Sequence, residues 1–179
     1  NLTYSWEQRD RGPGRAIGTV DDGEIPLFRV WGPDSTPQRY LPKLETVVSG
    51  LSDSSERLPS KARTMNFAFM VRDGRGGVAV DTMQARVTAA PLVERSFSIV
   101  EPNGGDSLGR TFTLRWNVGG TDSTPISTPE MEVYLSTDSG ATFSSTPVTV
   151  VQNDGYARVS LPEGIQTDSA RLMLKGKEN

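Results

Sequence analysis

Short segments in which apolar and polar residues alternate constrain the fold of this chain most strongly. In the run 111–118, Phe112, Leu114 and Trp116 alternate with polar neighbours. A period of two puts successive side chains on opposite faces of a strand, so this run predicts a half-buried β-strand. An all-β protein with many short antiparallel strands is therefore expected. Further strands are predicted at 2–7, 27–31, 65–71, 83–87, 97–100, 131–135, 148–150, 157–161 and 170–174.

Turn-forming residues separate these segments along the whole chain. Eighteen Gly and twelve Pro are scattered through 179 residues, which favours many short strands over disorder. The glycine-rich segment 73–77 lies between two predicted strands and indicates a β-hairpin. In contrast, Leu44, Val47 and Val48 follow helical spacing, and Gly50 suits the position after a helix C-terminus. One short helix is therefore predicted there.

The strand pattern divides into two halves at Ala89-Ala90-Pro91. The length of the chain accommodates two modules of about 90 residues each. We therefore predict two tandem immunoglobulin-like antiparallel β-sandwiches. Residues 1–91 form the first, immunoglobulin- or PKD-like, with the helix as a crossover, and residues 92–179 form the second. Trp6 and Trp116, each on an early strand of its half, are the expected core tryptophans.

The chain contains no histidine and no cysteine. This removes the commonest general base, the Ser–His and Cys–His nucleophile pairs and the usual zinc ligands. No pair of carboxylates is marked by spacing or by apolar surroundings that would raise a pKa. The chain is therefore predicted not to be an enzyme in itself, and a hydrolase that uses carboxylates alone is the alternative.

Charge and hydropathy restrict the partners. The net charge is −3 and no basic cluster stands out, so nucleic acid is not an expected partner. No apolar run approaches the length of a membrane span. Asn1 is followed directly by a predicted strand, with no initiator Met and no signal peptide, which indicates a fragment or a processed product.

Metal binding is left to oxygen ligands, for which calcium is the natural ion, and no other cofactor is expected. Asp73 and Asp81 flank the glycine-rich turn and are the candidate calcium ligands. The alternative is that Asp73 only nucleates the turn. Tyr40, Trp31 and Tyr156 are candidates for an aromatic platform that binds sugars or peptides; burial in the core is the alternative, and it is favoured for Trp31.

The most specific local motif is the run 136–143, which fits the Asp-box pattern Ser-x-Asp-x-Gly-x-Thr-aromatic. Ser136, Asp138, Gly140, Thr142 and Phe143 occupy its fixed positions. Asp138 is expected to accept hydrogen bonds from turn amides, Gly140 to adopt a positive φ, and Phe143 to hold the hairpin against the core. These local requirements favour a structural role, with ligand binding as the alternative.

Two sets of segments carry a family resemblance. The first half resembles a region that lies C-terminal to the catalytic domain in large secreted bacterial zinc metalloproteases of the reprolysin-like (metzincin) type. The segments that carry this resemblance are Leu2–Gln8, Pro26–Arg29, Ala62–Phe67 and Val71–Asp73. The second half resembles the module that follows that region, in the segments 102–105, 114–118, 135–140, 153–155 and 170–172.

The resemblance implies an extracellular accessory region that acts as a spacer, stabiliser or targeting module. Its partners would be the parent catalytic domain and an extracellular protein or polysaccharide. The family's zinc motif, His-Glu-x-x-His-x-x-Gly-x-x-His, is absent, so no catalytic residue is carried over. The family also has strands before Leu2 and after Asn179, so the first sandwich would lack its first strands and the second its last, leaving an open sheet edge. The alternative is a carbohydrate- or protein-binding adhesin-type module of a cell-surface protein.

Overall fold

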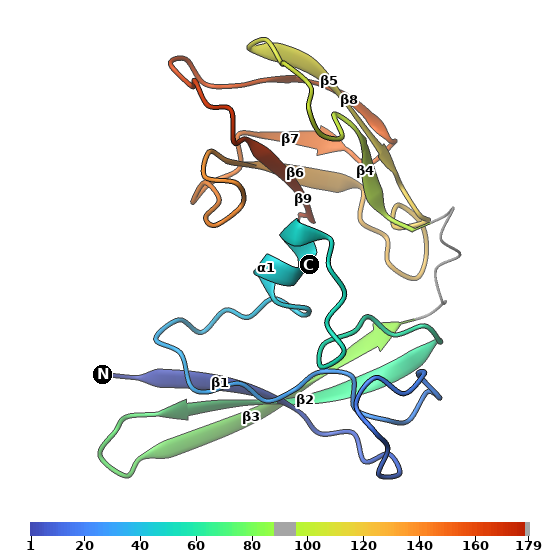
Figure 1. The fold of residues 1–179 in the computed structure, drawn as a ribbon, viewed down its shortest axis with the longest axis vertical. Helices are drawn as coiled ribbons and strands as arrows, with labels where there is room; N and C mark the ends of the chain where they lie inside the picture. The colour runs from blue at the N-terminus through green and yellow to red at the C-terminus, as the bar shows by residue number, and fades with distance from the viewer. Residues whose placement is uncertain (88–95, 178–179) are drawn as a thin grey trace. The chain divides into compact units, whose positions relative to one another are not determined.

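A computed structural model describes residues 1–87 and 96–177 of the chain. The chain divides into two compact units, Asn1–Ala90 and Pro91–Asn179. The described residues form three antiparallel three-stranded sheets and one short helix (Figure 1). The all-β prediction is thus confirmed. The boundary motif at 89–91 lies outside the described residues.

A single sheet forms the frame of the first unit. Its strands, in the order β1-β2-β3, are β1 (Thr3–Gln8), β2 (Arg63–Arg72) and β3 (Val78–Val87). β2 and β3 pair along their whole length and the turn at 73–77 joins them, which confirms the predicted hairpin. On the outer edge of β1, the backbones of Tyr4 and Asp34 exchange two hydrogen bonds of 2.8 Å. In the described part of this unit, the second layer of the predicted sandwich is not a sheet.

The segment 9–62 packs against this sheet in place of a second one. The core combines residues of this segment with residues of β2, namely Ile25, Leu27, Phe28, Met65 and Phe67. The strand predicted at 27–31 is wrong, because Phe28 makes only an isolated bridge with Glu56. The amides of Leu27 and Phe28 both donate to Oε1 of Gln8, at 2.7 and 2.9 Å. A side chain therefore satisfies the backbone where a neighbouring strand was expected.

A buried ion pair fastens the same segment to β2. The Arg63 side chain, only 4% exposed, donates from Nη1 to Oδ1 of Asp21 and to the carbonyl oxygen of Ile25, each at 2.9 Å. Burial alone would raise the pKa of Asp21, but the N–H groups of Gly23 and Ser60 and the Arg63 guanidinium together hold it below its usual range. Both ions are thus partnered, as buried charges require.

The helix α1 (Leu44–Ser49) lies at the predicted position. It ends at Gly50, which adopts the left-handed conformation with a φ of 66° and donates its N–H to the carbonyl oxygen of Val47 at 3.4 Å. Glycine has no Cβ and reaches this conformation without steric cost.

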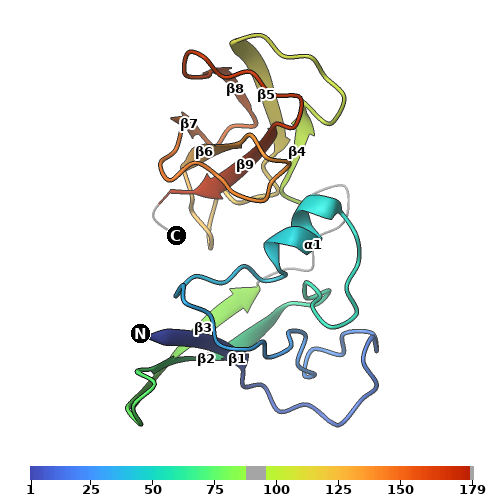
Figure 2. The same ribbon diagram turned by 60° about the vertical axis from the view of Figure 1, so that its left-hand side comes forward.

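The second unit contains two sheets that share one core. Leu114, Val133 and Val159 are completely buried and come from strands of both sheets. Trp116 lies in the same cluster, as predicted, and its indole N–H donates to Oδ1 of Asn153 at 3.0 Å. Figure 2 shows the two sheets as separate layers, β4-β5-β8 and β7-β6-β9. Their strands, which match the predicted ones, are β4 (Ser98–Glu101), β5 (Thr111–Asn117), β6 (Glu130–Ser136), β7 (Thr149–Gln152), β8 (Tyr156–Ser160) and β9 (Arg171–Gly176).

Candidate functional site

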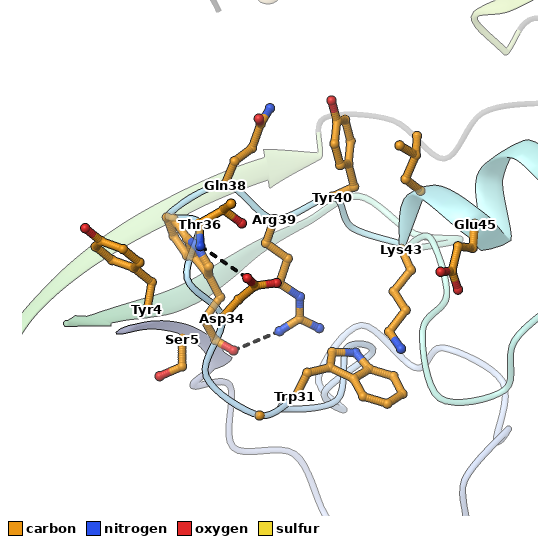
Figure 3. Close-up of a pocket in the computed structure, with 13 residues that line it drawn as sticks. Tyr4, Ser5, Trp31, Asp34, Thr36, Gln38, Arg39, Tyr40, Lys43 and Glu45 are labelled. Atoms are coloured by element: carbon orange, nitrogen blue, oxygen red, sulfur yellow. Dashed lines mark hydrogen bonds between the residues drawn. The ribbon is translucent and has the colours of Figure 1, made fainter. Parts of the chain in front are cut away.

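A cleft lies beside β1, where the loop 31–43 and the start of α1 pass the edge of the sheet (Figure 3). Its volume of about 290 Å³ is at the lower end of the range for small-molecule sites. Its lining combines four aromatic residues with polar and charged side chains, chiefly Tyr4, Trp6, Trp31, Tyr40, Asp34, Thr36, Gln38, Arg39, Lys43 and Glu45.

A buried carboxylate behind the lining holds one wall of the cleft. Glu56 is 1% exposed and accepts hydrogen bonds from the indole N–H of Trp31, the guanidinium of Arg39 and the backbone N–H of Lys43. Arg39 also donates from Nη1 to the carbonyl oxygen of Trp6 at 2.9 Å. One carboxylate therefore fixes three lining residues, while its own charge is compensated by Arg39.

The ammonium of Lys43 lies against the indole of Trp31. Its Nζ is 3.2 Å from the ring centroid, the geometry of a cation–π contact (Figure 3). Within the described residues, Lys43 forms no ion pair. The ammonium therefore keeps donor capacity for a molecule in the cleft.

The rim of the cleft is attached to β1 at several points. Besides the bridge between Tyr4 and Asp34, the indole N–H of Trp6 donates to the carbonyl oxygen of Pro37 at 2.9 Å. Oδ1 of Asp34 accepts the N–H of Thr36 at 3.2 Å, and this bond lowers the pKa of Asp34. The loop is thus held in place without a ligand, so binding would order few groups.

Two exposed carboxylates, Asp34 and Glu45, line the cleft. Figure 3 shows them at opposite ends, with Arg39 and Lys43 drawn between them. A general acid needs a raised pKa, whereas the N–H of Thr36 lowers that of Asp34. The lowered pKa therefore suits Asp34 to accepting hydrogen bonds rather than to acting as a general acid.

The structure does not bring the two candidate calcium ligands together. Oδ1 of Asp73 accepts the N–H groups of Arg75 and Gly77, at 2.7 and 2.9 Å, and these bonds lower its pKa. Asp81 lies in β3, and its Oδ1 accepts the N–H of Thr82 at 2.8 Å. About four residue steps along the hairpin, roughly 13 Å, separate the two aspartates, too far to share one ion. Calcium binding stays a prediction.

The Asp-box residues lie together in one turn after β6. Oγ of Ser136 donates to Oδ1 of Asp138 at 2.7 Å and accepts the N–H of Gly140 at 2.8 Å. Asp138 accepts the hydroxyl of Thr142 at 2.6 Å and its N–H at 2.9 Å. The Thr142 hydroxyl and N–H, together with Ser136, lower the pKa of Asp138 to about 2. Gly140 has a φ of 91°, and Phe143 is half-buried.

Of the three aromatic candidates, Trp31 and Tyr40 line the cleft. Trp31 is half-buried, so it differs from the core residue that the sequence favours. Tyr156 lies in β8, where it is 53% exposed, and the Arg115 guanidinium is 5.8 Å from its ring centroid. The sequence did not point to Arg39, Lys43 or Glu56; their only signal is that Arg39 and Lys43 lie close to Tyr40 in a proline-containing loop.

Comparison with known proteins assigns no family. No family model, no curated protein and no solved structure matches this chain. Among the described residues, no helix has the length and apolar character needed to cross a membrane.

Proposed function

We propose that this chain is a non-catalytic accessory region of a secreted bacterial metalloprotease, and that the cleft of its first unit holds a macromolecular ligand for the parent enzyme. The observation that carries the proposal is the preformed cleft, in which Glu56 fixes Trp31, Arg39 and Lys43. A site that is ordered before binding loses little conformational entropy when the ligand arrives.

The sequence supports a role other than catalysis. The chain has no histidine and no cysteine, so the commonest general base and the Ser–His and Cys–His nucleophile pairs are missing. The resemblance to the region that follows metzincin catalytic domains supports the same role, and it supports an extracellular location.

We also propose that the second unit is an immunoglobulin-like sandwich that acts as a spacer. The chain runs through β4 and β5 in one sheet and β6 and β7 in the other, then returns to the first with β8 and to the second with β9. This alternation supports the Greek-key connectivity of such sandwiches. Asp138 accepts two hydrogen bonds from Thr142 and so stabilises the turn that follows β6, which is consistent with a structural role of this turn in the sandwich.

The parent protein can be tested through its reading frame. We expect the frame that encodes this chain to encode the zinc motif His-Glu-x-x-His-x-x-Gly-x-x-His upstream of Asn1. A frame that lacks the motif and carries a cell-surface anchor would contradict the protease assignment and favour the adhesin-type module.

Ligand capture can be tested by co-sedimentation of the chain with insoluble collagen, chitin and cellulose. We expect at least one material to retain the chain, and Tyr40→Ala to weaken retention because Tyr40 lines the cleft. Tyr156→Ala, an exposed tyrosine of the second unit, is the matched control. Failure of all three materials to retain the chain would contradict the binding role and leave a spacer.

A further inference from the structure

The ligand class follows from the lining of this cleft. We infer that the cleft binds a neutral polysaccharide, one sugar ring of which occupies it. The inference rests on the proposed function, because it names the ligand of the same site. Its support comes from the size, the aromatic lining, the charge balance and the strand edge beside the cleft.

The volume and the aromatic lining match one sugar ring. A volume of about 290 Å³ is enough for a single sugar ring. A pyranose has apolar C–H faces, which pack on aromatic rings. Tyr40 is 36% exposed, and Tyr4 stacks on Phe69 at 5.8 Å with an interplanar angle of 9°. This contact holds the ring of Tyr4 in a fixed orientation in the lining.

The polar lining offers both donors and acceptors, as sugar hydroxyls require. Lys43 donates from an ammonium that forms no ion pair in the described residues, while Asp34 and Glu45 accept. Gln38, which also lines the cleft, can do both. Because Arg39 is compensated by Glu56, the lining has no excess of positive charge. A polyanion would therefore find no electrostatic complement here.

The edge of β1 beside the cleft disfavours an extended peptide. Peptides commonly bind by adding a strand to an open sheet edge. On β1 the N–H and C=O of Tyr4 are bonded to Asp34, and the carbonyl oxygen of Trp6 accepts from Arg39. These backbone groups are thus occupied, and side chains are left to make the contacts. A sugar can be bound by side chains alone, so this arrangement suits a sugar better than a polypeptide, which would need free backbone groups on the strand.

Affinity gel electrophoresis of the whole chain tests this inference. The gels contain laminarin, dextran, galactomannan or hydroxyethylcellulose as neutral probes, and alginate as the anionic probe. We expect at least one neutral polysaccharide to retard the chain. Tyr40→Ala and Lys43→Gln should each raise the dissociation constant by about fivefold, as the loss of one aromatic or charged contact does. Tyr156→Ala should leave it unchanged.

Three results would overturn the inference. The first is retardation by alginate without retardation by any neutral probe. The second is retardation by a neutral probe that neither Tyr40→Ala nor Lys43→Gln weakens, which would place the site elsewhere. The third is no retardation at all, together with no retention of the chain by insoluble chitin or cellulose. In that case, collagen retention that Tyr40→Ala abolishes would leave the binding role intact with a protein ligand, and no retention by any material would remove both proposals.

Discussion

Single side chains decide whether the cleft is a fixed site. Glu56 is bonded to Arg39, Trp31 and Lys43, and its side chain is fully buried. Glu56→Ala leaves the largely buried guanidinium of Arg39 without its counter-ion, so we expect the free energy of unfolding to fall by about 3–5 kcal/mol. Urea denaturation measures this loss. Glu45→Ala, an exposed carboxylate of the same cleft, should change it by less than about 0.5 kcal/mol. Equal small losses would contradict the role given to Glu56.

The Asp138 turn predicts how stability depends on pH. Hydrogen bonds from Thr142 and Ser136 lower the pKa of Asp138 from 3.8 to about 2. A depressed pKa in the folded state means that the carboxylate stabilises the fold above about pH 4 and that this contribution is lost as the pH falls toward 2. Asp138→Asn should therefore be less stable than the native chain at pH 7 and close to it at pH 2. Thermal unfolding at both pH values checks this, and a constant difference would contradict it.

At the scale of elements, β3 is an edge strand that one aspartate protects. Within the described residues β3 pairs only with β2, and Val78 and Val80 are 59% and 58% exposed. Asp81 occupies the N–H of Thr82 and adds a charge to the edge, a device that discourages pairing with other chains. Asp81→Val should therefore promote association, visible in sedimentation velocity as a mass that rises with concentration. Asp122→Val, in an exposed loop, is the control; the same mass for both variants would contradict this role of Asp81.

The elements that the sequence predicts are those whose signal is local. Alternation in β5 and the glycine-rich turn between β2 and β3 depend on neighbouring residues, and both elements were found where expected. The segment 27–31 has the composition of a strand, but two of its amides donate hydrogen bonds to the side chain of Gln8, about twenty residues away, instead of to a neighbouring strand. When a distant side chain, rather than a neighbouring strand, accepts the hydrogen bonds of a segment's backbone, the local pattern of apolar and polar residues does not show it.

The cleft could not be predicted from the sequence, because the contacts that form it join residues that are distant in the chain. Glu56 lies in a polar stretch, and nothing in its spacing marks it as buried. Its role comes from Trp31 and Lys43, which are 25 and 13 residues away in the chain. The aromatic candidates Trp31 and Tyr40 could be found because residue type alone suits them to binding. The contacts that turn them into a site arise only in the fold.

At the scale of the whole molecule, the two units have different parts in the proposed function. The first unit contains the cleft, and the second contains a closely packed core of two sheets that suits a spacer. The proposed function requires a ligand that enters the cleft and leaves the core of the second unit unchanged. The three tryptophans report on these two places separately, since Trp6 and Trp31 line the cleft and Trp116 is buried in that core.

The most direct test is the ¹H–¹⁵N spectrum of the whole chain during titration with short β-glucan, dextran and mannan oligosaccharides. The indole N–H groups of Trp6, Trp31 and Trp116 bond to Pro37, Glu56 and Asn153 and give one signal each. We expect the signals of Trp6 and Trp31 to shift saturably with at least one oligosaccharide while that of Trp116 stays fixed. Three fixed signals with every oligosaccharide, or a shift of Trp116 alone, would contradict it.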